Sequence, residues 1–266
     1  MEFDIDRVAF TIFGLDVYWY GIIIVTGILV SAIFAKKEFE RRGYKADIVD
    51  DILFAILPIG VIGARIWYVI FEWDYYGAHP NEIIDIRGGG LAIQGGIIFG
   101  LIALYIFSKR RDIPMIDLTD ILSPSLAFAQ AVGRWGNFAN AEAHGYPTDL
   151  PWGIIIDGVK VHPTFFYESF GDFLIFLFLV LYRKKNPSKG FISGIYFLAY
   201  GLVRFFVEGL RTDSLYVFGL RTAQLVSIVF MIVGVCLLIY AKRENLPPHF
   251  YKEKKNIKED KIIKFK

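Results

Sequence analysis

The sequence predicts an all-α polytopic membrane protein with seven transmembrane helices, an outside N-terminus and a cytoplasmic C-terminus. Of its 266 residues, 55% are hydrophobic and only 21% are charged, and the mean hydropathy is +0.46. Soluble domains carry about 25% charged residues, so this chain lacks the polar surface of a water-soluble globule. Cys236 is the only cysteine, which excludes a disulfide scaffold.

Seven stretches approach the length of about 20 mostly apolar residues that a helix needs to cross a bilayer. They cover residues 17–35, 51–71, 91–107, 118–134, 164–182, 191–207 and 222–240. The fourth stretch is the least apolar, because Pro124 and several small polar residues interrupt it. A proline is tolerated in a membrane helix when neighbouring helices satisfy the backbone groups that it frees.

Lysine and arginine predict the orientation, because they accumulate in cytoplasmic loops. Most of the 29 basic residues lie in three connections, 36–45, 109–111 and 183–189, and in the tail from Lys242 onward. These segments alternate with segments that hold few basic residues, so the pattern requires all seven spans. We therefore expect a membrane domain over residues 1–245, with small outer-face loops at 72–90 and 135–163, and a basic, disordered cytoplasmic tail over residues 246–266.

Three arginines lie within or at the mouths of the spans: Arg65, Arg134 and Arg204. An arginine at membrane depth is costly, from about 3 to more than about 10 kcal/mol, and indicates a functional site. The orientation brings these arginines, with Tyr20 and Gln94, to the outer-leaflet level, and leaves almost no such groups in the cytoplasmic half. This distribution favours a site open to the outer leaflet over a channel or a proton pump.

The first dense polar cluster is the segment Gly133 to Gly145, GRWGNFANAEAHG. Arg134 and Asn137 are three residues apart and share one helix face, and the glycines beside them permit close approach of a backbone or a ligand. A capped helix end, with the arginine extending to the interface, is the alternative interpretation. Asn140 and Glu142 add two polar groups that a helix cap does not need.

The second cluster is a stripe formed by Tyr200, Arg204 and Glu208, which recur every four residues of one predicted helix and continue to Arg211. Arg204 and Glu208 form either a purely structural ion pair or a pair that holds a planar guanidinium toward a phosphate. No His or Cys spacing resembles a metal site, and no nucleotide-binding loop is present. We expect no metal, no cofactor and no nucleic-acid partner.

These segments resemble the prolipoprotein diacylglyceryl transferase family of bacterial inner membranes. Six blocks occur in the order of that family: YWYG (Tyr18 to Gly21), GARIWY (Gly63 to Tyr68), GGGLAIQGG (Gly88 to Gly96), GRWGNFANAEAHG, HPTFFYES (His162 to Ser169) and YGLVRFFVEGLRTD (Tyr200 to Asp213). The resemblance implies a multi-pass transferase of the bacterial cytoplasmic (inner) membrane with its active site toward the outer leaflet. Such an enzyme moves the diacylglyceryl group of phosphatidylglycerol to the lipobox cysteine thiol of a prolipoprotein signal peptide. This first step of lipoprotein maturation forms a thioether and releases glycerol phosphate.

The resemblance also implies site residues. Catalytic roles are expected for Tyr20, Arg134, Glu142 and Arg204. Contacts with phosphatidylglycerol are expected from Arg65, Gln94, Arg134, Asn137, Asn140, Gly145, Tyr200, Arg204 and Glu208. Many family members have a histidine where this chain has Gln94, and glutamine takes up no proton at pH 7. The acceptor of the thiol proton therefore stays open among Tyr20, Glu142 and water.

Two other classes of protein compete with this interpretation. A lipid or small-molecule transporter would carry intramembrane arginines too, but should also have polar groups in the cytoplasmic half. A seven-helix photoreceptor needs a lysine in its last span, and residues 222–240 contain none. Cys236, deep in that span, is expected to be a packing residue rather than a nucleophile.

Overall fold

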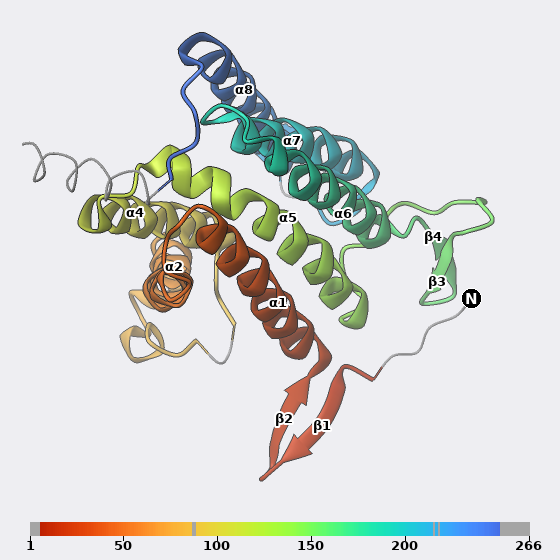
Figure 1. Ribbon diagram of the computed structural model, residues 1–266. Coiled ribbons are helices and arrows are strands. Elements are labelled where there is room, and N and C mark those ends of the chain that lie inside the picture. The colour runs from red at the N-terminus through yellow and green to blue at the C-terminus, as the bar shows by residue number, and fades with distance from the viewer. Residues whose placement is uncertain (1–5, 87–88, 215, 218, 251–266) are drawn as a thin grey trace, which may run out of the picture.

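The computed structural model describes residues 6–86, 89–214, 216–217 and 219–250. Arg87 and Gly88, at the start of the glycine-rich block, and tail residues 251–266 lie outside this set. Within the described residues the chain forms eight α-helices and three two-stranded hairpins (Figure 1). The seven long helices are α1 (Trp19–Arg41), α2 (Ile48–Phe71), α4 (Ile93–Arg111), α5 (Met115–Ala139), α6 (Thr164–Tyr182), α7 (Phe191–Leu210) and α8 (Thr222–Glu244).

Each apolar stretch read from the sequence is one of these long helices, with shifts at the ends. Val17 belongs to a strand, and α1 begins two residues later, at Trp19. At its other end α1 continues to Arg41, so Lys36 and Lys37 of the first basic connection are helical. The positive charges near this helix end interact favourably with its unpaired carbonyls.

Six of the long helices, all except α5, are long and apolar enough to cross a membrane; the segment containing α6 runs on through the 3₁₀ turn η2 (Arg183–Lys185). The chain is therefore a multi-pass membrane protein. The exception, α5, has 25 residues but contains Asp117, Asp120, Arg134 and Pro124. Both of its aspartates are buried by neighbouring helices.

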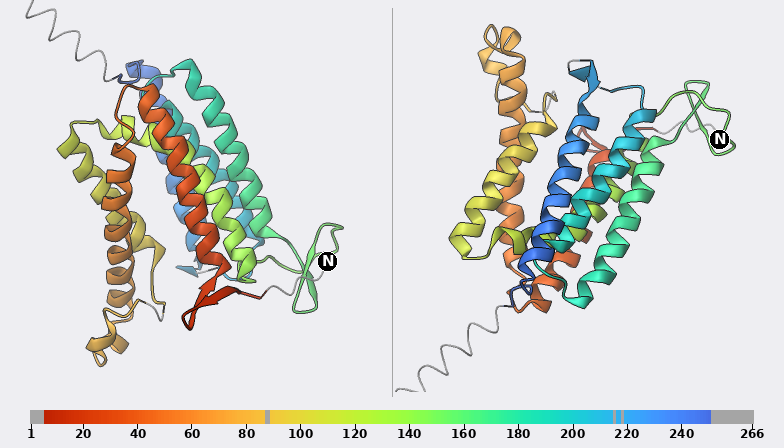
Figure 2. Two further views of the ribbon diagram at one scale, coloured as in Figure 1. Left: turned by 60° about the horizontal axis from the view of Figure 1, so that its bottom comes forward. Right: turned by 90° about the horizontal axis from the view of Figure 1, so that it is seen from above.

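Helix α5 occupies the centre of the bundle, with α1 on one side and α6 and α7 on the other (Figure 1). Helix α8 covers α7, and α2 and α4 form a closely packed pair that stands beside the other helices (Figure 2). One apolar core joins α5, α6 and α7 around Phe176, Leu179 and Ile192. A second joins α1, α2, α4 and α5, with Phe39 and Phe107 among its members.

The short elements lie in the connections at one end of the bundle, where α2, α5 and α7 end and α1, α4, α6 and α8 begin. They are β1 (Val8–Ile12), β2 (Leu15–Tyr18), α3 (Trp73–Tyr76), the 3₁₀ turn η1 (Pro80–Glu82), β3 (Ile154–Ile156), β4 (Val159–Val161), β5 (Tyr216–Val217) and β6 (Leu220–Arg221). Each hairpin is antiparallel. We call this end, which also holds Arg134 and Arg204, the site end of the bundle.

The opposite end of the bundle contains buried charges, so the expectation that this half holds almost none is wrong. Glu38 is 0% exposed and pairs with Arg41, Arg42 and Arg183. Asp117 pairs with Arg42 and with Lys189. These groups neutralise one another, which a buried charge requires. Arg41 and Arg42 follow Glu38 at helix spacing, whereas the pairs of Glu38 with Arg183 and of Asp117 with Arg42 and Lys189 join distant segments that spacing does not connect.

Asp120 lies at the same end and fastens α5 to the start of α7. Its carboxylate accepts hydrogen bonds from the backbone N–H groups of Gly190, at 2.7 Å, and Ser193, at 2.8 Å. The Ser193 hydroxyl donates a third bond at 2.7 Å. A carboxylate at a helix N-terminus satisfies N–H groups that the helix itself leaves unpaired.

Two further features bear on expectations from the sequence: the position of Cys236 and the start of the basic tail. Cys236 is exposed on α8, so the prediction that it is a packing residue is wrong. The start of the basic tail lies against the end of the bundle opposite the site. There the carbonyl of Leu246 accepts a hydrogen bond from the Lys189 N–H at 2.9 Å, and His249 Nδ1 lies 2.6 Å from the Tyr44 hydroxyl.

Candidate active site

A polar cavity of about 310 Å³ opens at the site end, between α4, α7, α8 and the central α5. Its polar lining consists of Gln94, Arg134, Tyr200, Arg204, Glu208, Arg211, Asp213, Thr222 and Ser227. Aliphatic and aromatic side chains from α4 and α8 form the rest of the wall. Five residues expected from the sequence to touch substrate are therefore brought together: Gln94, Arg134, Tyr200, Arg204 and Glu208. We call this space the arginine cavity.

Glu168 of α6 holds the two arginines of the cavity from behind. Nη2 of Arg134 lies 2.6 Å from one oxygen of Glu168, and Nη1 of Arg204 lies 2.7 Å from the other. The Glu168 side chain is 1% exposed, whereas those of Arg134 and Arg204 keep 21% and 16% exposure. One carboxylate thus anchors two guanidinium groups that belong to two other helices and still reach the cavity.

Arg204 also pairs with Glu208, one turn further along α7, at 2.8 Å. The ion pair considered from the sequence is present, and both of its members line the cavity. The structure therefore does not force a choice between the structural and the functional interpretation. Two carboxylates hold the Arg204 fork in a fixed plane, and such pre-orientation favours two-point recognition of a phosphate.

Sequence reasoning missed two acidic residues of this site, Glu168 and Asp172. Both lie on the buried face of α6, four residues apart, and both are nearly inaccessible. The signal was present in the sequence as two carboxylates within an otherwise apolar span. The partners of Glu168 are Arg134 and Arg204, which lie 34 and 36 residues away along the chain. Helix spacing therefore could not connect Glu168 with either arginine.

A second cavity, of about 580 Å³, lies beside the C-terminal end of α5 and is lined by Tyr20, Asn140 and Glu142. The Glu142 carboxylate accepts hydrogen bonds from the side-chain amides of Asn137, at 2.9 Å, and Asn140, at 3.4 Å. Arg134 and Glu142 both interact electrostatically with Tyr20. We call this space the tyrosine cavity; Tyr20 and Arg134 lie between it and the arginine cavity.

Gly136 allows α1 to approach α5 closely at this point. A Cβ atom on Gly136 would lie 2.9 Å from the Tyr20 ring. The glycine block of the sequence thus provides space for a neighbouring side chain, as expected for a close approach. It places the Tyr20 ring directly against the helix that carries Arg134 and Asn137.

Gly145 does not line either cavity, although the resemblance assigns it a contact with lipid. Its N–H donates to the carbonyl of His162 at 2.9 Å, and its backbone pairs with Arg211 at the end of α7. A Cβ atom there would lie 2.7 Å from the His162 Cβ and 2.8 Å from the Leu210 carbonyl oxygen. Gly145 thus joins the segment after α5 to the ends of α6 and α7.

We expect Gly145→Ala to lower stability by about 1–3 kcal/mol, the usual cost of overpacking. The backbone atoms around Gly145 cannot rotate away as a side chain can. Thermal unfolding in detergent measures the effect, with Gly100→Ala as the matched control, because the Gly100 Cβ would meet only an ordinary contact at 3.5 Å. Equal melting temperatures for the two variants would contradict this role.

Arg65 also lies away from both cavities, despite its expected contact with lipid. Its guanidinium donates to four backbone carbonyls in the segment before α4, at 2.6 to 3.0 Å; these belong to Glu82, Ile83, Gly89 and Gly90. The residue is 7% exposed. In this arrangement Arg65 holds the chain that leads into α4, and α4 carries Gln94 into the arginine cavity.

Replacing Arg65 with alanine leaves those carbonyls without their donor, at about 1–3 kcal/mol for each group that water does not reach. We expect Arg65→Ala to lower the melting temperature, and to lower kcat for lipid turnover because Gln94 loses its support. Arg110→Ala, at an exposed position of α4, is the control. Unchanged stability together with a raised KM alone would instead indicate direct contact between Arg65 and the lipid.

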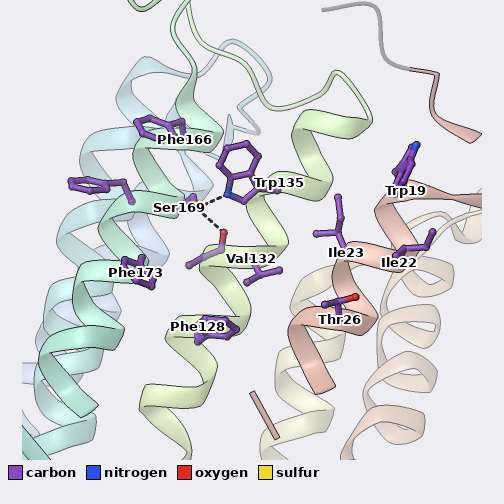
Figure 3. A pocket seen from close by; sticks show the side chains of 12 residues that line it. Trp19, Ile22, Ile23, Thr26, Phe128, Val132, Trp135, Phe166, Ser169 and Phe173 are labelled. Carbon is purple, nitrogen blue, oxygen red and sulfur yellow. Dashed lines mark hydrogen bonds between the residues drawn. The ribbon is translucent and has the colours of Figure 1, made fainter. Parts of the chain in front are cut away.

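Apolar hollows accompany the polar cavities. One, of about 550 Å³, lies between α1, α5 and α6, with Trp19, Phe128 and Phe173 in its wall (Figure 3). The Trp135 indole N–H donates to the Ser169 hydroxyl at 3.1 Å, and that hydroxyl donates to the Ala131 carbonyl at 2.7 Å. The polar groups of Trp135 and Ser169 are thus hydrogen-bonded, and most of the other side chains in this wall are apolar.

Among the residues that the structure describes, no group of three His, Cys, Asp or Glu side chains could hold a metal ion. The basic groups of the arginine cavity instead suit an anion, since guanidinium groups bind phosphate through paired N–H donors. The hollow between α1, α5 and α6 suits hydrocarbon, since its wall is mostly apolar. Fold and cavities together define a multi-pass membrane protein with a basic cavity that suits an anionic ligand.

Comparison with known proteins places the chain within this class. Residues 7–240 match the family model described as prolipoprotein diacylglyceryl transferase. The chain is 53% identical over 240 residues to the phosphatidylglycerol–prolipoprotein diacylglyceryl transferase of Finegoldia magna, which covers 90% of this chain and 97% of that protein. It is 48% identical to the protein of that name from Clostridioides difficile, with the same coverage of both chains, and 44% identical to that from Clostridium novyi over 90% of this chain. The chain belongs to the prolipoprotein diacylglyceryl transferase family.

Proposed function

We propose that this chain is a membrane transferase that moves the diacylglyceryl group of phosphatidylglycerol to the lipobox cysteine thiol of a prolipoprotein. Family membership and the names of the relatives support the transferase activity and both substrates. Within the structure, one observation carries the assignment of the site: Arg134 and Arg204 share Glu168 and line one cavity. The phosphate of the lipid lies between these arginines.

The reaction breaks a carbon–oxygen bond and forms a carbon–sulfur bond. The thiolate attacks the carbon of the diacylglyceryl group that is bonded to the phosphate oxygen. Glycerol phosphate leaves with the electron pair of the broken bond. Negative charge therefore grows on the phosphate oxygen as that bond breaks. Arg134 and Arg204 stabilise this charge, and Glu168 holds them in position before the reaction starts, so little reorganisation is needed.

The thiol must lose its proton, because the thiolate is the nucleophile and an ordinary cysteine is mostly protonated at neutral pH. Of the three candidates, we propose Glu142 as the acceptor. Its carboxylate lines the tyrosine cavity beside Tyr20, and two side-chain amides orient it. The peptide thiol enters from this side, and Gln94 in the arginine cavity orients the lipid by hydrogen bonding.

We further propose that α5 also crosses the membrane, as the fourth of seven spans along the chain. Its polar side is covered by α1, α6 and α7. The site end then faces the outer leaflet of the bacterial cytoplasmic membrane, with the N-terminus outside and the C-terminus in the cytoplasm. The alternation of basic connections supports this orientation. Residues 1–245 form the catalytic membrane domain, and residues 246–266 the basic tail.

The buried charges at the opposite end remove one argument against a transporter, which also needs polar groups there. Those charges pair with one another, however, and none of them lines the arginine cavity, the tyrosine cavity or the apolar hollow between α1, α5 and α6. Among the described residues, these three spaces therefore form no polar path between the two ends of the bundle, which a transporter would need.

Direct transfer tests the proposal. Purified protein in vesicles receives phosphatidylglycerol labelled in the glycerol carbons of its diacylglyceryl group together with a lipobox peptide. The expected product is a labelled peptide whose thioether survives mild alkali, which removes ester-linked acyl chains; a peptide with serine in place of the cysteine should remain unlabelled. Label on the serine peptide, or lipid movement between leaflets without any peptide product, would overturn the proposal.

A further inference from the structure

The β1–β2 hairpin turns at a residue that is unfavourable for its place. Phe13 and Gly14 connect the two strands, with φ angles of 51° and 77°. A two-residue turn with positive φ at both positions favours Asn, Asp or Gly at the first of them, and a bulky residue is strained there. The β3–β4 hairpin has the favoured pair at the same place, Asp157 and Gly158, with φ angles of 50° and 76°.

Within the described chain, Phe13 has no burial that would offset this strain. Its side chain is fully exposed, and a Cβ atom on the neighbouring Gly14 would meet nothing within 4 Å. A strained turn residue and an exposed aromatic ring are both unfavourable in water. Contact of the ring with an apolar surface outside the chain accounts for both.

The apolar surface continues from the tip along one face of the hairpin. Cross-strand pairing places Ile12 opposite Leu15, on the same face as Phe10. All three side chains are exposed. The other face is polar, since the Thr11 hydroxyl donates to the Asp16 carboxylate at 2.7 Å. A two-stranded hairpin is marginally stable by itself in water, so its apolar face needs a partner.

The lipid-facing surface of α1 is continuous with this face. Strand β2 runs directly into α1, which is long and apolar enough to cross a membrane. Its exposed residues include Trp19 at its start and Leu29 and Ile33 further along. Aromatic residues gather where the hydrocarbon of a bilayer meets water. The hairpin turns away from the axis of α1 and lies across the end of the bundle (Figure 2), which keeps it near this level.

A second hairpin repeats the apolar tip. Between β5 and β6, the sequence Phe218-Gly219-Leu220 matches the Phe-Gly-Leu sequence of the first tip. Phe218 lies outside the described residues, whereas Tyr216 and Leu220 are exposed and Gly219 has a φ of 76°. This hairpin leads directly into α8, another helix that can cross a membrane. The same tip therefore precedes two spans at the site end.

We propose that the apolar face and tip of the β1–β2 hairpin insert into the interfacial region of the lipid bilayer at the site end. Lipid suits this surface better than a lipobox peptide does. The tip is fully exposed, and neither the two polar cavities nor the hollow between α1, α5 and α6 includes Phe10, Ile12, Phe13 or Leu15. The choice of leaflet rests on the proposed orientation, whereas the contact with lipid does not.

This anchor bears on the site because the base of the hairpin forms part of the tyrosine cavity. Asp16 and Tyr18 line that cavity together with Tyr20. The Trp19 N–H donates to the carbonyl of Arg7, just before β1, at 3.1 Å. Lipid contact at the tip therefore fixes one wall of the cavity through which the peptide thiol enters. Phe13 is a positioning residue, because it acts through this wall and touches no reacting atom.

Quenching by lipid tests the contact without using activity. A fluorophore is attached to Phe13→Cys or, as the matched control, to Asp157→Cys, each combined with Cys236→Ala because Cys236 is exposed. In vesicles of phosphatidylglycerol and phosphatidylcholine, nitroxide on the acyl chains should quench the probe at position 13 and aqueous iodide should not. The probe at position 157 should show the reverse. Equal lipid quenching at both positions, quenching at position 13 by iodide alone, or a response there only after a lipobox peptide is added would overturn the proposal.

Phe13→Asn separates the turn from the anchor. Asparagine tolerates positive φ, so the melting temperature in detergent should stay the same or rise. In vesicles, kcat/KM for the lipobox peptide should fall by up to about 10²-fold, the cost of a small misplacement in a site. Phe13→Trp should restore it, because tryptophan favours the interface. An unchanged kcat/KM in Phe13→Asn would overturn the positioning role. Lipid quenching at position 13 in a protein without transfer activity would overturn the proposed function and support the anchor.

Discussion

Arg204→Ala should abolish measurable diacylglyceryl transfer, and Arg134→Ala should do the same, while both proteins still insert into the membrane. Each change removes an N–H fork that faces the growing phosphate charge in a cavity whose wall is partly apolar. Losing one pre-oriented donor of this kind costs about 10²- to 10³-fold in rate. Transfer of labelled phosphatidylglycerol to a lipobox peptide, measured with purified protein, gives the result directly.

Lysine should not rescue either position. Its ammonium keeps the charge but lacks the planar fork that spans both Glu168 and a phosphate. Arg110→Ala is the matched control, because Arg110 is exposed at the opposite end of α4 and should leave transfer unchanged. Near-normal transfer by Arg134→Ala or Arg204→Ala would contradict the assignment of the site.

Glu168→Gln should have the second-largest effect, because one carboxylate anchors both arginines. Glutamine keeps the shape of the side chain but leaves two partly buried guanidinium groups without their shared counter-ion. Breaking a buried ion pair costs about 3–5 kcal/mol, so we expect a lower melting temperature. We also expect transfer to fall by about 10²-fold or more, since the donors lose their orientation.

Glu244→Gln, at the exposed end of α8, controls for the loss of a carboxylate elsewhere. Both quantities should be measured on the same preparation, so that a fall in kcat in folded protein is separated from unfolding. Full stability and full activity in Glu168→Gln would show that Arg134 and Arg204 keep their positions without Glu168.

The helices were predictable because the bilayer imposes one requirement, a long apolar run, that a single sequence displays. Composition alone does not identify α5 as a span, since Asp117, Asp120 and Arg134 lower its hydropathy. The alternation of basic connections pointed to it, and the structure places it at the centre of the bundle. A central helix touches little lipid and can carry polar residues that its neighbours cover.

The site was predicted most directly where its residues share a helix. Tyr200, Arg204 and Glu208 form a regular stripe, and the structure places all three on one cavity. Glu168 was overlooked because both of its arginine partners lie on other helices. Arg65 has a position in the sequence that resembles that of a ligand-binding arginine, and in the structure its guanidinium donates to backbone carbonyls.

The location of the bound lipid headgroup tests the central claim most directly. Phosphatidylglycerol with a photoreactive headgroup can be cross-linked to the protein in vesicles, and the modified peptides can be identified by mass spectrometry. The label should fall on residues that line the arginine cavity, such as Gln94 on α4 and Tyr200 on α7, and Arg204→Ala should reduce it strongly. Headgroup label confined to the apolar hollow between α1, α5 and α6, or label unchanged in Arg204→Ala, would contradict the account.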